Sequence, residues 1–202
     1  VGDANVRFQE DALRLMRAIR QATQLGFEIE NETMNSLQTH AKLITGISGE
    51  RIQGELFKLI ASNNAADGIL LMRDAGLLQY ILPEVDECFG VEQKSPERHH
   101  IYDVGTHLVE SLRHCPSSNV ITRLATLIHD VGKKETQRID PETQIITFYN
   151  HEVVGEKQAK QIATRLRLSK NDAQQLVMLV RQHQCTVSEE QSDKALRRFI
   201  RQ

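Results

Sequence analysis

The stretch that most constrains this chain is residues 123–134, RLATLIHDVGKK, where an apolar run ends on an adjacent histidine and aspartate. The apolar residues recur at the three-and-four spacing of a helix that buries one face, so the run predicts a core helix. His129 and Asp130 therefore stand where a buried helix meets a polar loop. An imidazole and a carboxylate held side by side can chelate one cation, and the carboxylate can bridge to a second.

Further histidines follow at intervals that fit a helix and a loop each, namely His107, His151 and His183. If each comes from its own helix, the fold can gather them around the dyad, although chance also places histidines near helix ends. We expect His151 at the exposed start of a helix, where a neutral imidazole is free to bind a metal. Lys133 or Lys134, just beyond the dyad, could hold a phosphate as a point charge.

The composition predicts an all-α fold. The 202 residues include 4 prolines and no Trp, and Leu, Ala, Gln, Glu and Arg abound, which favours helices. With 40% hydrophobic residues, the chain can bury a sizeable core. Residues 136–149 are the exception, because Asp140 and Pro141 form a turn between two β-favouring runs and predict one short hairpin.

A polar connection at residues 90–97 predicts a boundary between two domains, 1–89 and 90–202. We expect a helical bundle in the first domain and a helical domain that carries the candidate metal ligands in the second. Because the chain begins with Val1 rather than Met, we expect it to be a piece of a longer protein.

Charge and cysteine content bear on partners and location. The net charge of -2 provides no overall basic field, so any RNA contact must rely on local patches. Cys88, Cys115 and Cys185 lack a CxxC spacing and predict reduced thiols in a cytoplasmic protein. No apolar run approaches the length of about 18 residues that a membrane helix needs, so we expect no membrane partner. The sequence leaves a homo-oligomer open.

A charged face is expected on the helix predicted over residues 10–25. Asp11, Arg14, Arg17 and Arg20 recur every three residues and should lie along one slowly drifting side. The common interpretation of such a face is a solvated surface with one ion pair. The alternative is chemical, because a carboxylate acceptor beside a guanidinium donor matches the Watson–Crick edge of cytosine or adenine.

Residues 48–60 predict another amphipathic helix. Arg51 and Glu55 have the four-residue spacing of a helical ion pair, and we expect that pair at the surface. The first half supplies neither the glycine-rich loop nor the Asp-x-Asp carboxylates that nucleotidyl transfer needs for its two metal ions.

Residues 7–27, RFQEDALRLMRAIRQATQLGF, resemble the neck helix of bacterial tRNA nucleotidyltransferases, the CCA-adding enzymes of the class II poly(A) polymerase superfamily. Residues 48–60 and 68–85 are similar to the helical neck and body of that family. The resemblance implies tRNA as partner, ATP and CTP as substrates, and Mg or Mn for nucleotidyl transfer in a head domain that this chain lacks.

The same resemblance implies roles for single residues. In the family a Glu-Asp-x-x-Arg motif selects CTP and ATP, which makes Asp11 and Arg14 the expected base readers. Arg17 and Arg20 would then supply supporting nucleotide contacts, to phosphates or to the base readers themselves.

The histidine series with its dyad resembles the HD domain of metal-dependent phosphohydrolases. Residues 147–156, TFYNHEVVGE, and 179–184, LVRQHQ, are similar to the HD segment of many CCA-adding enzymes. The resemblance implies a Mn, Ni, Co, Fe, Zn or Mg ion that activates water against a phosphoester, with Lys133 beside the dyad as a catalytic candidate. The implied ligands are His107, His129, Asp130, His151 and His183.

The chain departs from the HD pattern in one respect. HD sites close with a later aspartate, which we expect in an Ala-Asp pair beyond Gln202, and we do not expect Asp193 to replace it. A site without that carboxylate should bind metal more weakly. Other functions stay open: an HD phosphodiesterase or phosphatase as the main activity, a relative that adds only A or makes poly(A), or an RNA-binding helical scaffold.

Overall fold

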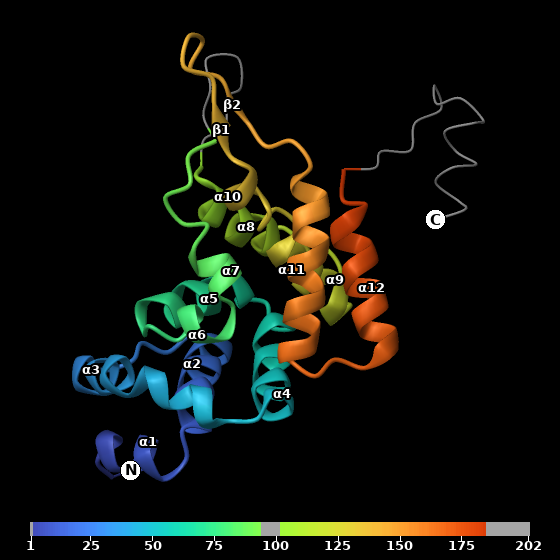
Figure 1. Ribbon diagram of the computed structural model, residues 1–202. Helices are drawn as coiled ribbons and strands as arrows, with labels where there is room; N and C mark the ends of the chain where they lie inside the picture. Colours follow the sequence, from blue (N-terminus) through green and yellow to red (C-terminus); the bar gives the residue numbers. More distant parts are fainter. Residues whose placement is uncertain (1, 94–101, 185–202) are drawn as a thin grey trace.

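The structure, a computed structural model that describes residues 2–93 and 102–184, is helical apart from one hairpin (Figure 1). The predicted all-α fold and the hairpin within residues 136–149 are confirmed, with Ile139 opposite Ile146 in antiparallel pairing. Among the described residues, no helix combines the length and apolar character needed to cross a membrane.

The helices are α1 (Ala4–Glu10), α2 (Leu13–Leu25), α3 (Asn31–His40), η1 (Ala41–Gly46), α4 (Gly49–Ile60), α5 (Ala65–Asp74), α6 (Leu78–Ile81), α7 (Pro83–Asp86), α8 (Val104–Arg113), α9 (Val120–Ile128), α10 (Lys133–Thr136), α11 (His151–Arg165) and α12 (Lys170–Arg181). The strands are β1 (Arg138–Ile139) and β2 (Ile146–Thr147).

The helices pack in two groups around a shared core (Figure 1). In the first group, α2 lies against α4 and α5; in the second, α12 lies against α9 and α11, and α8 against α9. The groups meet where α5 packs on α8 and α4 on α9. The buried apolar side chains form one continuous cluster through both groups. The domain boundary at residues 90–97 therefore stays a prediction.

Two arginines of the second group hold it to the first. Arg123 donates from Nε to the Ile60 carbonyl at 2.6 Å and from Nη2 to the Ser62 carbonyl at 3.1 Å. Arg165 pairs with Glu84 at 2.6 Å. Charge-assisted bonds of this kind satisfy carbonyls that a helix end leaves without partners. Arg123 thereby fixes α9, which leads into the dyad, against the end of α4, and Arg165 fixes α11 against α7.

The prediction of a helix over residues 10–25 is wrong at its start, because α1 ends at Glu10 and α2 begins only at Leu13. Asp11 is extended, with φ -150° and ψ 103°, and its Oδ1 accepts a hydrogen bond from the Leu13 backbone N–H at 3.1 Å. A short carboxylate that bonds to a nearby backbone N–H competes with helix formation. Asp11 consequently precedes the helical face that carries Arg14, rather than lying on it.

Gly132 lies where the start of α10 approaches the start of α11. A Cβ at this position would lie 2.7 Å from the Gly155 backbone nitrogen and closer still to the His151 backbone oxygen. Its φ of -65° suits any residue, so the requirement is space rather than backbone freedom. The preceding helix α9 has already ended at Ile128, so Gly132 is not its terminating residue.

Gly132→Ala is expected to push α11 outward and to lower the free energy of unfolding by about 2–3 kcal/mol, as overpacking does. Chemical denaturation of the chain followed by circular dichroism measures the change. The control is Gly54→Ala within α4, where a Cβ would meet no atom within 4 Å and the helix should gain slightly. Equal stability of the Gly132 variant and the unmodified chain would contradict the requirement for space.

Candidate metal centre

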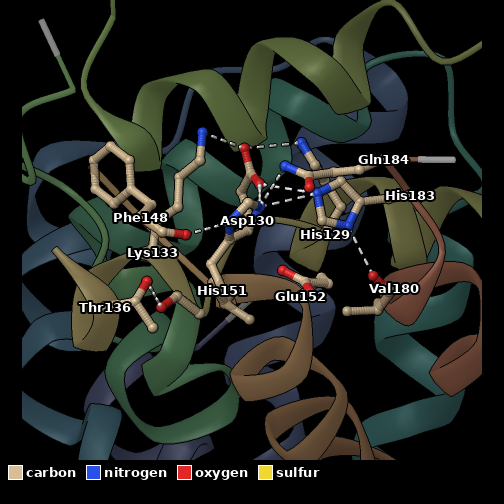
Figure 2. Close-up of polar contacts among 12 residues, drawn as sticks. His129, Asp130, Lys133, Thr136, Phe148, His151, Glu152, Val180, His183 and Gln184 are labelled. Carbon is tan, nitrogen blue, oxygen red and sulfur yellow. Dashed lines mark hydrogen bonds and ion pairs between the residues drawn. The ribbon is translucent and has the colours of Figure 1, made fainter. Parts of the chain in front are cut away.

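Side chains from four helical elements converge beside the C-terminal end of α9, and we name them the His/Asp cluster (Figure 2). The middle of α8 supplies one histidine, and the residues directly after α9 supply the dyad. The first residue of α11 and a residue just after α12 supply the others. The five members are His107, His129, Asp130, His151 and His183.

Asp130 is the centre of the His/Asp cluster. Its Oδ2 lies 3.5 Å from Nε2 of His107 and 3.2 Å from Nε2 of His129. Its Oδ1 lies 3.1 Å from Nε2 of His151 and 3.2 Å from Nε2 of His183. The cluster thus contains two groups of ligand atoms that share one carboxylate. Each carboxylate oxygen faces one pair of imidazoles, an arrangement that suits a bridging ligand between two cations.

Backbone carbonyls orient most of the rings. Nδ1 of His129 lies 2.8 Å from the Thr126 carbonyl, and Nδ1 of His151 lies 2.8 Å from the Phe148 carbonyl. Nδ1 of His183 lies 2.7 Å from the Val180 carbonyl. A carbonyl only accepts, so Nδ1 carries the proton and a neutral ring directs the lone pair of Nε2 into the cluster. This second layer of hydrogen bonds is typical of metal-ligating histidines.

The facing nitrogen atoms favour a cation in the cluster. Nε2 of His107 and Nε2 of His129 are 3.2 Å apart, and Nε2 of His151 and Nε2 of His183 are also 3.2 Å apart. Two lone pairs at this distance repel unless a proton or a metal ion lies between them. Imidazole nitrogen with carboxylate oxygen is the donor set of Mn, Fe, Co, Ni or Zn sites, so the residues present fit a divalent metal.

Burial and hydrogen bonding keep Asp130 charged. Burial alone would raise its pKa, but the surrounding histidines, His107 first, hold that pKa far below the ordinary value when their Nε2 atoms carry a proton toward the carboxylate. His151 is 4% exposed, so the expectation of an exposed ring at a helix start is wrong. The preceding Asn150 has a left-handed backbone, φ 62°, which turns the chain and directs the ring inward.

Lys133 contacts the His/Asp cluster through Asp130, whereas Lys134 pairs elsewhere. Nζ of Lys133 lies 2.7 Å from Oδ2 of Asp130 and donates to Oε1 of Gln93 at 2.9 Å. Lys134 instead pairs with Glu87. Of the two lysines considered for a phosphate contact, Lys133 is therefore the one beside the carboxylate.

The late Asp193 and the thiol of Cys185 lie outside the described residues. The other cysteines are free thiols, Cys88 buried and Cys115 half-buried. Burial raises the pKa of the Cys88 thiol to about 12, which keeps it protonated and unreactive.

Two arginines of the predicted charged face of α2, Arg17 and Arg20, pair with α4 rather than being free. Glu55 accepts from Nε of Arg20 at 2.7 Å and lies 3.5 Å from Nε of Arg17. Arg51 pairs with Asp11 at 3.0 Å. The expectation that Arg51 and Glu55 pair with each other at the surface is therefore wrong. Arg14, the remaining member, pairs with Glu10 at 2.6 Å.

Glu55 is the functional candidate that sequence reasoning missed. Its side chain is 6% exposed, although its partners reach the surface. A signal was present, because Glu55 falls between Ile52 and Leu59 on the apolar stripe of α4. A carboxylate within such a stripe is costly to bury unless a cation neutralises it.

Glu55→Gln is expected to lower the free energy of unfolding by about 1–2 kcal/mol at pH 7. Burial raises the pKa of Glu55, but the hydrogen bond and charge of Arg20 outweigh it and leave that pKa lowered. The carboxylate therefore stabilises the fold above the ordinary glutamate pKa of about 4.3, and this contribution disappears as pH falls through the lowered pKa. Denaturation at several pH values should show the difference narrowing in acid. Glu142→Gln in the exposed hairpin turn is the control, and a pH-independent difference would contradict the ion pairing.

Comparison with known proteins follows the division into two helical groups. Residues 26–89 match the family described as "Probable RNA and SrmB-binding site of polymerase A", and residues 98–198 match the HD domain. The A-adding tRNA nucleotidyltransferase of Deinococcus radiodurans is 37% identical over 209 residues, covering 99% of this chain and 46% of that protein. The CC-adding tRNA nucleotidyltransferase of Thermus thermophilus is 35% identical over 200 residues, covering 95% and 45%. A multifunctional CCA protein of Acinetobacter baumannii is 33% identical over 183 residues, covering 87% and 43%.

The chain spans about half the length of the curated relatives it matches. Its similarity to tRNA nucleotidyltransferases, predicted from the neck-helix and histidine segments, is confirmed over nearly the entire sequence. The HD match covers residues 98–198, half of the 202 residues, and includes every member of the His/Asp cluster. The chain therefore belongs to the HD domain family, in the form that accompanies the RNA-binding region of tRNA nucleotidyltransferases.

Proposed function

We propose that this chain is the nucleotide-selecting and tRNA-positioning part of a cytoplasmic enzyme that builds tRNA 3′ ends. The observation that carries the proposal is its likeness along 99% and 95% of its length to A-adding and CC-adding tRNA nucleotidyltransferases. The match of residues 26–89 to an RNA-binding region supports a tRNA partner. Those relatives differ in the nucleotides they add, one A and the other CC, so an incorporation assay decides whether this protein selects CTP, ATP or both.

Within this proposal, the charged face of α2 and the preceding Asp11 read the nucleotide. Glu55 holds Arg17 and Arg20 in fixed orientations, which lowers the entropy lost when they contact a nucleotide. Asp11 and Arg14 hold surface partners that the amino group and ring nitrogen of a base would replace. The test is nucleotide choice by Asp11 and Arg14 variants of the protein that carries this segment together with its polymerising head.

We further propose that the His/Asp cluster holds one or two divalent ions and hydrolyses phosphoesters. The carrying observation is the set of Nε2 atoms that face Asp130 from both sides. A bound divalent ion would supply a Lewis acid and an activated water. Asp130 and its histidines would hold that ion, and the ammonium of Lys133 would attract the phosphate and offset its charge.

An RNA-binding scaffold without chemistry is the remaining candidate. It predicts tRNA binding that weakens steeply with salt, and no metal-dependent turnover of 2′,3′-cyclic nucleotides. Metal-dependent turnover of 2′,3′-cyclic nucleotides that is lost in an Asp130 variant would exclude the scaffold without chemistry.

A further inference from the structure

A groove of about 430 Å³ lies in the first group of helices, where α2, the loop after it, α3 and α5 meet. Its floor is apolar and includes Ile29, Met34 and Leu71, which are half-buried and pack against the core. The volume is within the range of concave sites that bind ligands. The floor of the groove is thus an edge of the core that the described helices leave partly uncovered.

Phe27 stands exposed in this groove because of the way α2 ends. Gly26 is left-handed, with φ 68°, and the Phe27 backbone N–H donates to the Ala22 carbonyl at 3.0 Å. At helix ends of this kind, an apolar residue in the place of Phe27 commonly packs on the residue in the place of Ala22. The methyl group of Ala22 is too small to cover a phenyl ring, and Phe27 remains 68% exposed. An exposed aromatic ring beside an apolar floor is typical of an interaction surface.

Most polar groups that line the groove already have partners within the chain. The Thr23 hydroxyl donates to the Ile19 carbonyl at 2.8 Å, and the Asn64 amide donates to the Thr23 carbonyl at 3.1 Å. Asp67 pairs with Arg113 at 2.8 Å. The walls are helices and a loop, so they offer no strand edge to which a β-strand could be added. An occupant is therefore recognised through side chains that fit the apolar floor.

The charge around the groove is acidic. Residues 21–39 contain Glu28, Glu30 and Glu32, all exposed, and no lysine, arginine or histidine. No cation of the described residues forms an ion pair with these three carboxylates. This rim would repel RNA phosphates, and a two-fold dimer would set the rim against a copy of itself. The charge instead complements a cationic partner.

We propose that this groove is the docking site for a basic amphipathic helix of a partner protein. Apolar residues of that helix, spaced three or four positions apart, pack on Phe27, Ile29 and Met34, and its lysines or arginines face the glutamates. The groove shares no lining residue with the charged face of α2 or with the His/Asp cluster, so this docking is independent of both proposed functions.

The experiment uses a fluorescently labelled amphipathic peptide of leucines and lysines, and a second peptide with glutamate in place of every lysine. Anisotropy measures the affinity of the 202-residue chain for each. The lysine peptide is expected to bind at least about tenfold more tightly than the glutamate peptide. Phe27→Ala should weaken the lysine peptide about tenfold or more, as loss of an aromatic anchor does. Tyr149→Ala, at an aromatic residue 78% exposed outside the groove, is the matched control and should leave the affinity unchanged.

The acidic rim is tested separately with Glu28→Gln. This variant should bind the lysine peptide about two- to fivefold more weakly at low salt, and the difference should disappear at high salt because exposed charges are then screened. Glu142→Gln in the exposed hairpin turn removes the same charge elsewhere and should have no effect.

Equal binding of the lysine peptide by the Phe27→Ala variant and the unmodified chain would overturn the docking site. Binding by the 202-residue chain but not by the longer protein with its polymerising head would also overturn it, because another segment of that protein would then cover the groove. RNA binding that depends on Phe27 would replace the partner protein with RNA. Self-association that Phe27→Ala disrupts would replace it with a second copy of the chain.

Discussion

Asp130→Asn is expected to abolish binding of a divalent ion at the His/Asp cluster and to lower metal-dependent phosphoester hydrolysis by at least about 100-fold. The amide keeps the shape of the carboxylate but removes the anion that faces imidazole nitrogens on both sides, at 3.2 Å from His129 and 3.1 Å from His151. Metal content is measured by mass spectrometry after dialysis against Mn²⁺ or Ni²⁺. Turnover is measured with 2′,3′-cyclic nucleotides and added metal.

The control variant is Asp86→Asn, which changes a half-buried carboxylate that lies 3.8 Å from Arg73 and contacts no member of the cluster in the described structure. It should keep full metal content and turnover. Asp130→Ala is a harsher second variant, because it leaves the half-buried Lys133 without its 2.7 Å carboxylate partner and should cost about 3–5 kcal/mol of stability. Circular dichroism separates unfolding from loss of the site. Metal content and turnover that survive both Asp130 variants would refute the assignment.

Arg14→Ala and Asp11→Ala are expected to reduce discrimination for C and A over U and G by about 10- to 100-fold in the protein that contains this segment and its polymerising head. Each variant removes one hydrogen-bonding group from the proposed base-reading pair, so a mismatched base no longer leaves that group without a hydrogen-bond partner in the complex. The measurement is incorporation of each nucleotide into tRNA that lacks its 3′ end.

Arg7→Ala is a closely matched control for Arg14→Ala. Both arginines pair with Glu10, at 2.7 Å and 2.6 Å, so both substitutions remove an ion pair to the same carboxylate. Arg7 lies on α1, outside the charged face of α2, and its variant should keep normal discrimination. Equal incorporation ratios in the Arg7, Arg14 and Asp11 variants would show that the base is read elsewhere.

Local sequence rules predicted much of this protein. Helical periodicity placed a buried helix before His129 and Asp130, and the turn at Asp140 and Pro141 placed the hairpin. Asn119 is a residue type typical of a helix N-cap, and its Oδ1 accepts from the Thr122 backbone N–H at the start of α9 at 2.9 Å. These features depend on residues within a few positions of one another, so a single sequence contains the information.

The sequence did not predict which charged side chains pair between different helices. The side chain of Glu55 meets Arg20, 35 positions away, rather than its helical neighbour Arg51. Asp11 leaves the helix because its carboxylate bonds to the Leu13 backbone N–H, and it then meets Arg51. Helical spacing describes one helix face, and the packing angle between α2 and α4 decides which charges meet across it.

The sequence by itself determined the helical class, the hairpin and the identity of the histidines and aspartate that form the cluster. Only the tertiary structure decided that Asp130 lies between two imidazole pairs, that His151 is buried, and that Lys133 rather than Lys134 faces the carboxylate. The physical reason is distance along the chain. The packing of α8, α9, α11 and α12 sets these contacts, and each needs side chains that only the shared core brings within a few ångströms of one another.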